Sequence, residues 1–214
     1  MLLQGKEFFD KGKRGLVYTA VLDGRKVLVK ERNPSADVDT VEHEALMLRK
    51  LNELGIGPRF IAFEDDSLVR EFVDGQRIEE FLADASALEA KVVVREVLRQ
   101  CRVMDEAGIN KFEMTHPYKH ILVSKADSSV QNTEDSSQGS ERGLSVVMID
   151  FERCRFSQRP KNVTQVCQYL ARISSSLHER GVSFDADEVL RLGEEYKRQG
   201  YSADVFDGLC SLFI

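Results

Sequence analysis

The sequence predicts an α+β protein with two lobes, an antiparallel β-sheet with one helix followed by a mainly helical part. Two observations support this prediction. Before residue 74, short apolar runs alternate with turn signals, and one run with helical spacing interrupts them. After residue 77, apolar residues recur mainly at helical spacing. We therefore expect an N-terminal lobe over residues 1–73 and a C-terminal lobe over residues 74–214.

In the N-terminal lobe, the pattern predicts strands around a single helix. The Asp23-Gly24 turn joins two apolar runs and predicts a tight hairpin. Apolar residues at helical spacing, among them Val41 and Leu48, predict a helix that stops at the Gly55-Ile56-Gly57-Pro58 segment. The expected strands cover residues 8–10, 16–22, 26–31, 59–63 and 67–73, and the expected helix covers 37–54.

The C-terminal lobe is expected to be mainly helical, with one small hairpin made by residues 121–123 and 144–149. Between these two runs, residues 124–143 are rich in Ser, Asp, Glu, Gln and Gly and contain no aromatic residue. We expect this stretch to be a flexible insert at the hairpin tip. The expected helices cover residues 78–82, 87–106, 163–180, 186–199 and 203–212.

Composition and charge limit the class of protein. The hydrophobic content of 42% is ordinary for a soluble domain, and no apolar run approaches the roughly 20 residues that a membrane helix needs. The net charge of -6 argues against general attraction to nucleic acid. The first residues turn polar by Gln4 and show no cleavage pattern, so we expect no secretory signal and a location in the cytoplasm or nucleoplasm. The cysteines show no close pairing and are expected to be free core thiols.

Lys30 and Glu44 form the first candidate pair. Lys30 ends an apolar strand, where an ammonium group needs an anionic partner or solvent. Glu44 falls on the apolar arc of the predicted helix, whereas Glu42 points away from it. The pair would orient the lysine toward a phosphate group, and the alternative is a purely structural ion pair.

Two further features carry chemistry only in combination with this pair. Gly12 and Gly15 lie at a strand turn, where backbone amides can approach a phosphate, although most glycine pairs of this kind only make a turn. Asp150 ends the apolar strand 146–149, where its carboxylate can reach a divalent cation or simply cap a turn.

The segment from Glu113 to Val123 contains several groups that transfer protons or bind anions, including His116, Lys119 and His120. Two histidines four residues apart on a helix would suggest a metal pair. Pro117 lies between them and argues against a regular helix, so we do not expect a zinc site here.

Together, these residues resemble a protein kinase, specifically the minimal atypical kinases predicted in archaea, which are similar to the RIO kinases and to the small kinase of the tRNA threonylcarbamoylation complex. The resemblance extends over nearly the whole chain, with the motifs in the expected order. Gly12 to Val17 resembles the end of the glycine-rich loop, Val27 to Lys30 the lysine strand, Glu44 the helix glutamate, Glu71 to Gly75 the adenine-binding hinge, Glu113 to Val123 the catalytic loop, and Asp150-Phe151-Glu152 the metal-binding triplet.

The resemblance implies a bilobal protein-kinase-like fold and an ATP-dependent phosphotransferase, a Ser/Thr kinase that acts on a protein or on itself. It implies ATP and Mg²⁺ as cofactors, with Mn²⁺ as an alternative ion. The implied nucleotide contacts are Gly12, Gly15, Val17, Lys30, Glu44, Glu71 and Val73. The implied catalytic residues are Glu113, Lys30 and Lys119, and the implied metal ligands are Asp150 and His120.

Four positions depart from the pattern of the family. Asp10 stands at the first glycine of the loop, and Lys111 stands where a histidine is common, two residues before the catalytic position. Glu113 stands at the catalytic aspartate, and His120 at an asparagine that binds magnesium. Because these changes affect the residues that support transfer, two alternatives stay open. One is a pseudokinase or ATP-binding scaffold with little transfer activity, and the other is a small-molecule kinase with the same fold.

A basic cluster follows the metal-binding triplet and consists of Arg153, Arg155, Arg159 and Lys161. The segment lacks the long activation loop and the Ala-Pro-Glu anchor of regulatory kinases, so we do not expect control by phosphorylation there. The cluster is a candidate contact for RNA, for a ribonucleoprotein or for an acidic protein, and the alternative is an ordinary solvated surface.

Overall fold

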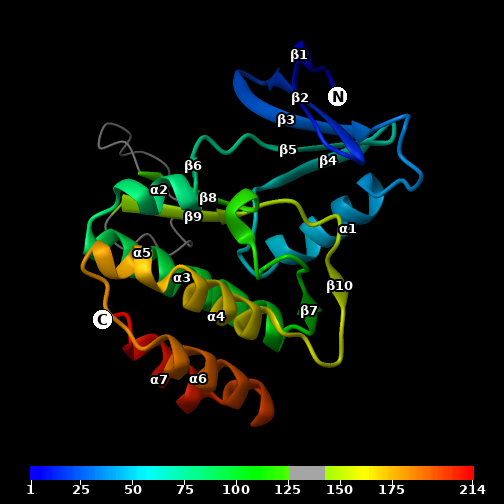
Figure 1. Cartoon of the computed structure of the whole chain (residues 1–214). Coiled ribbons are helices and arrows are strands. Elements are labelled where there is room, and N and C mark those ends of the chain that lie inside the picture. Colours follow the sequence, from blue (N-terminus) through cyan, green and yellow to red (C-terminus); the bar gives the residue numbers. More distant parts are fainter. Residues whose placement is uncertain (126–142) are drawn as a thin grey trace. The chain divides into compact units, whose positions relative to one another are not determined.

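The computed structural model describes residues 1–125 and 143–214 (Figure 1). The chain divides into two compact units. The first unit comprises residues 1–74 and 147–154, and the second comprises 75–146 and 155–214. The predicted N-terminal lobe, 1–73, therefore lies within the first unit, together with a segment that the sequence placed in the second lobe. Most of the predicted flexible insert 124–143 lies outside the described residues, whereas Ser124 and Lys125 belong to a strand.

The first unit contains an antiparallel five-stranded sheet with the order β1-β2-β3-β5-β4. Val27 and Val29 of β3 pack with Ala20 and Val69 on one face of this sheet. Because side chains alternate along a strand, Leu28 and Lys30 lie on the opposite face, which contacts α1. The elements are β1 (Gln4–Lys11), β2 (Gly15–Leu22), β3 (Arg25–Arg32), α1 (Val41–Asn52), β4 (Phe60–Glu64) and β5 (Ser67–Glu71).

Helix α1 is shorter at both ends than the predicted 37–54. At its start, the Asp39 carboxylate accepts a hydrogen bond from the backbone N–H of Val41 at 3.0 Å, a local contact that competes with an earlier helical turn. At its end, Asn52 donates to the carbonyl oxygens of Ile56 and Pro58, both at 3.0 Å. Within the helix, Glu44 is buried among Val41, Ala45 and Leu48, as the spacing predicted.

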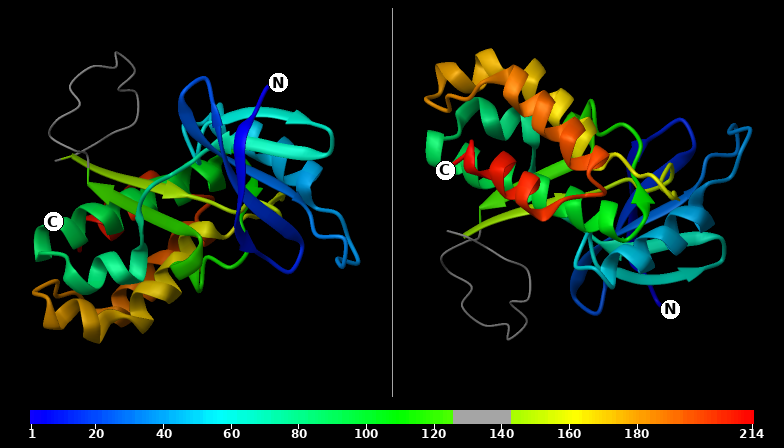
Figure 2. Two further views of the ribbon diagram at one scale, coloured as in Figure 1. Left: turned by 90° about the horizontal axis from the view of Figure 1, so that it is seen from above. Right: turned by 90° about the horizontal axis from the view of Figure 1, so that it is seen from below.

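The second unit is mainly helical, with two small sheets (Figures 1 and 2). Helix α3 packs against α4, α4 against α6, and α6 against α7. The last two residues of β9 belong to the first unit, and the other elements lie wholly in the second. The elements are β6 (Gln76–Arg77), α2 (Ile78–Asp84), α3 (Ala87–Glu106), β7 (Ile109–Asn110), the 3₁₀ helix η1 (Pro117–Lys119), β8 (Ile121–Lys125), β9 (Leu144–Met148), β10 (Arg155–Phe156), α4 (Asn162–Arg172), α5 (Ser174–Glu179), α6 (Ala186–Arg198) and α7 (Ala203–Ser211).

A glycine lets α4 and α6 come close together. A Cβ atom built at Gly193 of α6 would lie 2.7 Å from the Cys167 sulfur of α4, closer than real contacts allow. Cys167 is buried, as are Cys101 and Cys154, and all four cysteines are free thiols, as predicted. Cysteine therefore acts here as a small core residue.

The predicted α+β class is confirmed, and the differences concern short elements. The predicted helix 163–180 is two helices, α4 and α5, which meet at Ile173. The two-residue strands β6, β7 and β10 were not predicted, because two residues leave no periodic pattern. Among the described residues, no helix has both the length and the apolar character to cross a membrane.

Candidate functional site

The Lys30 ammonium group lies among three carboxylates of the first unit. Its Nζ atom is 2.5 Å from a Glu44 oxygen, 3.2 Å from Glu152 and 3.5 Å from Asp150. Strand β3 contributes the lysine, α1 contributes Glu44, and the segment 147–154 contributes the other two. The structure thus brings together Lys30, Glu44 and Asp150, three predicted site residues that are distant in sequence.

Burial and charge act in opposite directions on Lys30, whose side chain is 11% exposed. Burial alone lowers the pKa of its ammonium group, but the charges of Glu44, Asp150 and Glu152 outweigh it, so the pKa is raised above its ordinary value. Lys30 is therefore a permanent cation at neutral pH. Glu44 is 2% exposed, and its second oxygen accepts a hydrogen bond from the backbone N–H of Phe151 at 3.4 Å.

The backbone at Asp150 adopts the left-handed conformation, with a φ of 62°. Asp is one of the few side chains that tolerate this conformation, and such residues gather at functional sites. The next residue, Phe151, is 1% exposed, and its ring lies close to Gly57. The buried ring anchors the segment in the first unit, whereas the Asp150 side chain stays 35% exposed.

Glu152 has contacts that sequence reasoning did not predict. One of its oxygens lies 3.3 Å from Nη1 of Arg14, and the other accepts a hydrogen bond from the Thr40 hydroxyl at 3.3 Å. Only the aspartate of the triplet 150–152 was assigned a role from the sequence. The signal that was available is the acidic residue two positions after Asp150, where the triplet of typical kinases has glycine.

The predicted glycine turn lies next to Lys30. A Cβ atom at Gly15 would come within 2.6 Å of the Lys30 Cε atom, so only glycine leaves room for the lysine side chain. Val17 is the cross-strand partner of Lys30 in the β2–β3 ladder. Gly12 donates its N–H to the Gly15 carbonyl at 2.8 Å. Asn33, a residue that sequence reasoning missed, donates to the carbonyl oxygens of residues 12 and 13, both at 3.2 Å.

The predicted hinge residues Glu71 and Val73 lie at and just beyond the end of β5. The backbone N–H of Glu71 donates to the Arg59 carbonyl at 2.9 Å, and the Glu71 carboxylate accepts the N–H of Arg59 at 3.0 Å. The Glu71 carbonyl oxygen accepts a hydrogen bond from the Arg70 side chain at 3.0 Å. The backbone and side chain of Glu71 are therefore held by Arg59 and Arg70.

Glu113, Lys119 and His120 belong to the second unit. The Glu113 backbone is left-handed, with a φ of 75°, and its carboxylate lies 3.2 Å from Nε2 of His120. The two predicted residues therefore contact each other within the second unit. Lys119 is exposed in η1, near the Tyr118 ring.

A buried polar network holds the chain just before Glu113. The Asp105 carboxylate accepts hydrogen bonds from the backbone and side chain of Asn162, at 2.9 and 2.7 Å, and from the N–H of Val163 at 3.1 Å. Asn162 in turn accepts the N–H of Lys111 at 2.7 Å. Burial raises the pKa of Asp105 to about 6, against the lowering effect of these hydrogen bonds.

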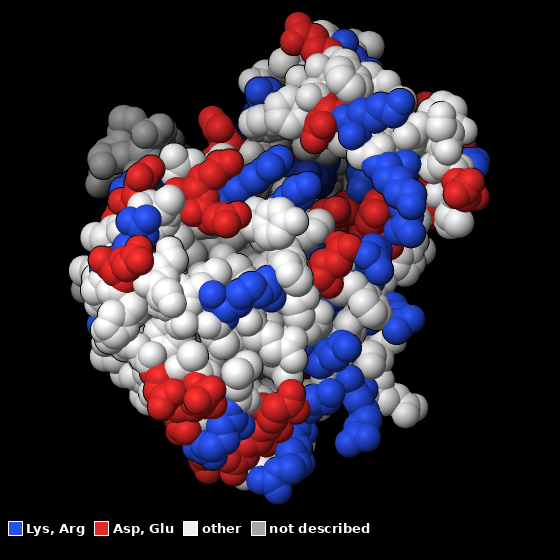
Figure 3. Space-filling view, viewed as in Figure 1, with Lys and Arg blue, Asp and Glu red and all other residues white. Residues whose placement is uncertain are grey.

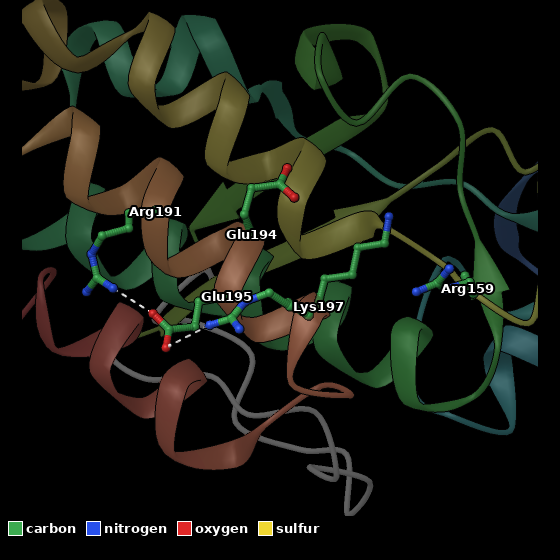
Figure 4. A pocket seen from close by; sticks show the side chains of 6 residues that line it. Arg159, Arg191, Glu194, Glu195 and Lys197 are labelled. Carbon is green, nitrogen blue, oxygen red and sulfur yellow. Dashed lines mark hydrogen bonds and ion pairs between the residues drawn. The ribbon is translucent and has the colours of Figure 1, made fainter.

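A basic pocket of about 620 Å³ lies in the second unit. Arg159 of the predicted basic cluster lines it from the segment before α4, and the other lining residues come from α6 (Figure 4). Arg191 is held by Glu188 and Glu195, whereas Lys197 and Arg159 form no ion pair with any described residue. Figure 3 shows Lys and Arg side chains gathered at the lower right, with acidic groups beside them. The lining residues are Arg159, Arg191, Glu194, Glu195, Lys197 and Arg198.

The donor set of the first unit fits a hard divalent cation. Carboxylate oxygens of Glu44, Asp150 and Glu152 lie within 4.8 Å of one another. Magnesium prefers such oxygen ligands and usually keeps several waters, so it needs only one or two carboxylates from the protein. Asp150 is the most exposed of the three and the best placed to reach an ion that accompanies a ligand.

Comparison with known proteins identifies the fold. No protein-family model matches the chain. Over 104 residues, the chain is 34% identical to the KEOPS complex subunit Bud32 of Pyrococcus abyssi, a match that covers 42% of this chain and 47% of that protein. The match thus spans about half the length of this curated relative.

Solved structures support the same conclusion. The Rio2 kinase from Chaetomium thermophilum, solved as an ADP/Mg²⁺-phosphoaspartate complex, matches 95% of this chain and 68% of its own, with a TM-score of 0.53 and 13% identity. The match to the Rad53 kinase domain covers 92% of this chain and 79% of that one, with a TM-score of 0.55 and 17% identity. The match to WaaP, solved in complex with acyl carrier protein, covers 99% of this chain and 90% of that one, with a TM-score of 0.54 and 18% identity. The chain has a protein-kinase-like fold and resembles the atypical kinases, as predicted.

Proposed function

We propose that this protein is an ATP-dependent phosphotransferase, an atypical Ser/Thr protein kinase that transfers the γ-phosphate of ATP to a hydroxyl group of a protein or of itself. The observation that supports the proposal best is the Lys30 ammonium group, held by Glu44, Asp150 and Glu152 beside the Gly15 turn. A lysine fixed by a helix glutamate is the arrangement that orients a cation toward nucleotide phosphates. The partial match to Bud32 supports an atypical kinase, and the ADP/Mg²⁺ complex of Rio2 supports this class of ligand.

In this proposal, Lys30 and the backbone of the Gly12–Gly15 turn bind the phosphates, and Val17 packs beside them. The backbone of residues 71–73 binds the base. Asp150, with Glu152 or Glu44, would hold magnesium, which neutralises phosphate charge when it is bound with the nucleotide. Glu113 orients the accepting hydroxyl, and Lys119 adds positive charge near the γ-phosphate. His120 fixes the Glu113 carboxylate rather than binding the ion, because magnesium disfavours imidazole.

The proposed partners follow from the surface of the second unit. The basic pocket around Arg159 and Lys197 is a candidate contact for the phosphates of RNA or a ribonucleoprotein, with Arg153, Arg155 and Lys161 nearby in sequence. We place the protein in the cytoplasm or nucleoplasm, where ATP and such partners are available.

A second candidate function is a nucleotide-binding scaffold with little transfer activity. The contacts of Glu152 favour it, because this carboxylate binds both Lys30 and Arg14, two cations that phosphates would need. A nucleotide has to compete with Glu152 for these cations, which lowers affinity or alters the position of the phosphates.

Transfer of the γ-phosphate distinguishes the two functions. The wild-type protein and its Lys30→Ala and Asp150→Asn variants would be incubated with labelled ATP and either Mg²⁺ or Mn²⁺, with and without a general protein substrate. The kinase predicts transfer by the wild type that falls at least about 100-fold in each variant, since both residues act on the transferred group. Lys50→Ala is a matched control, because Lys50 is exposed on α1 and pairs only with Glu53 among the described residues.

Binding of ATP is measured in parallel, and circular dichroism checks that each variant is folded. Asp150→Asn keeps the Lys30–Glu44 pair, so this variant remains informative even if Lys30→Ala unfolds. Wild-type transfer no greater than that of the variants, combined with intact ATP binding, would reject the kinase and favour the scaffold.

A further inference from the structure

Arg70 is a buried cation on the same face of the first sheet as Lys30. It is 8% exposed, and its cross-strand partner in β3 is Leu28. Because cross-strand partners share a face and side chains alternate, Arg70, Leu28 and Lys30 all lie on the face that α1 contacts. Arg70 is also the residue immediately before Glu71, so it lies between the lysine and the segment 71–73.

The Arg70 side chain makes one hydrogen bond among the described residues. Its Nη1 atom donates to the backbone carbonyl of Glu71 at 3.0 Å. No described carboxylate forms an ion pair with it, although the charges of Glu44 and Asp150 act on it through space. A guanidinium group has five N–H donors and no acceptor, so Arg70 presents further donors to this face of the sheet.

This arrangement has a direct consequence for a purine base, and the inference rests on the nucleotide site proposed above. If Lys30 binds the phosphates and residues 71–73 bind the base, the base lies beside Arg70. Adenine carries an amino group at position 6, which needs an acceptor, and at the Glu71 carbonyl it would share that acceptor with the Arg70 guanidinium. Inosine and guanosine carry an oxygen at position 6, which accepts hydrogen bonds from a guanidinium donor, the pairing that Arg makes with guanine in nucleic acids.

We propose that Arg70 makes this site selective for 6-oxopurine nucleotides, so that ITP and GTP bind more tightly than ATP. The selectivity comes from one matched contact and one mismatched contact. The oxygen at position 6 gains a charged donor, whereas the amino group of adenine faces that donor and has to share the Glu71 carbonyl with it. Buried sites reject ligands that leave polar groups unpaired, so one such contact changes affinity about tenfold or more.

The test is a comparison of three nucleotides on the full chain. Dissociation constants for ATP, ITP and GTP, each with Mg²⁺, are measured by calorimetry for the wild type and for Arg70→Met, which keeps the length of the side chain without its donors. The bases of ITP and ATP differ in the group at position 6, whereas the base of GTP also carries an amino group at position 2. The comparison of ITP with ATP therefore isolates the contact of Arg70 with the group at position 6. Arg59→Met is the matched control, because it removes an exposed arginine that adjoins the same segment.

We expect wild type and Arg59→Met to bind ITP about tenfold more tightly than ATP, and Arg70→Met to lose or reverse that preference. Arg70→Lys, which keeps the charge but not the planar fork, provides a second variant if Arg70→Met does not fold. A wild-type preference for ATP, or an equal loss for all three nucleotides in the Arg70 variants, would overturn the inference and leave the proposed nucleotide site standing. Absence of binding by all three nucleotides in the wild type would overturn both.

Discussion

A missing methyl group at position 57 allows Phe151, and with it Asp150, to lie against α1. The backbone of Gly57 is left-handed, with a φ of 85°, and a Cβ atom there would be 2.7 Å from the Phe151 ring and 3.0 Å from Leu48. The sequence indicated Gly57 only as part of a helix stop. Its second role depends on a contact with a residue almost a hundred positions away, which no local pattern reveals.

Replacement of Gly57 by alanine should therefore destabilise the first unit by two effects. The left-handed backbone costs a non-glycine residue about 1 kcal/mol, and overpacking against Phe151 and Leu48 adds about 1–3 kcal/mol. Gly55→Ala is a matched control, since its φ is 70° and nothing lies within 4 Å of the added Cβ. Urea denaturation of both variants measures the difference, and equal losses would show that the Phe151 contact tolerates the methyl group.

The residues of the candidate site were predictable where a local pattern carried them. Lys30 at a strand end and Glu44 on an apolar helix arc each require a partner, so their pairing follows from burial alone. The contacts of Glu152 with Arg14 and Thr40 were not predictable. Glu152, Arg14 and Thr40 are polar residues in loops, and the sequence pattern does not predict which loop residues contact each other in the folded chain.

The end of α3 and the start of α4 are joined by the Asp105–Asn162 hydrogen bonds. Neither residue was singled out from the sequence. A single aspartate near the end of a helix looks like an ordinary exposed residue, and nothing in the local pattern marks Asn162 as its partner. The network fixes β7 and the approach to Glu113, since Asn162 also donates to the Ile109 carbonyl at 2.6 Å. Asp105 is 2% exposed, so the network is buried.

This network predicts a pH dependence of stability. The pKa of Asp105 is about 6 in the folded protein, against 3.8 as its ordinary value, so the folded state binds the proton more tightly between about pH 4 and 6. The resulting stability is fully present below about pH 4 and is lost as the pH rises through 6, by about 3 kcal/mol. The free energy of unfolding is measured from pH 4 to 7 for the wild type and for Asp105→Asn. It should fall with rising pH in the wild type, and this fall should be absent in the variant. Parallel pH profiles for the two proteins would contradict the assignment.

At the level of elements, long periodic segments were predicted correctly and their boundaries less well. Helix α3 has the predicted bounds, because an apolar stripe runs along it and a Ser86–Glu89 capping box marks its start. Helix α1 starts late because Asp39 takes the N–H of Val41. Strands β7 and β10 exist only because they pair with each other, which is long-range information.

For the whole molecule, the proposed ligands should stabilise the folded state. A non-hydrolysable ATP analogue at about 100 times its dissociation constant adds about 2.7 kcal/mol, which corresponds to about 5–10 °C in the melting temperature of a protein of this size. Adding Mg²⁺ should increase the shift further, because in the proposed site Asp150 would hold the ion together with the nucleotide.

In Asp150→Asn, the nucleotide shift should remain and the added effect of Mg²⁺ should disappear. Asp66→Asn, in the exposed turn between β4 and β5, serves as the control and should behave as the wild type. Differential scanning fluorimetry measures both quantities. A Mg²⁺ effect that survives in Asp150→Asn would assign the ion to other ligands.

The chain passes between the two units three times, at residues 74–75, 146–147 and 154–155. Lys30 and Asp150 therefore belong to one unit that is assembled from two separate stretches of chain. No single cut can release that unit intact, because a fragment ending at residue 74 has the lysine without the aspartate. Any attempt to produce it alone must splice residues 147–154 onto the first stretch or supply them as a second peptide.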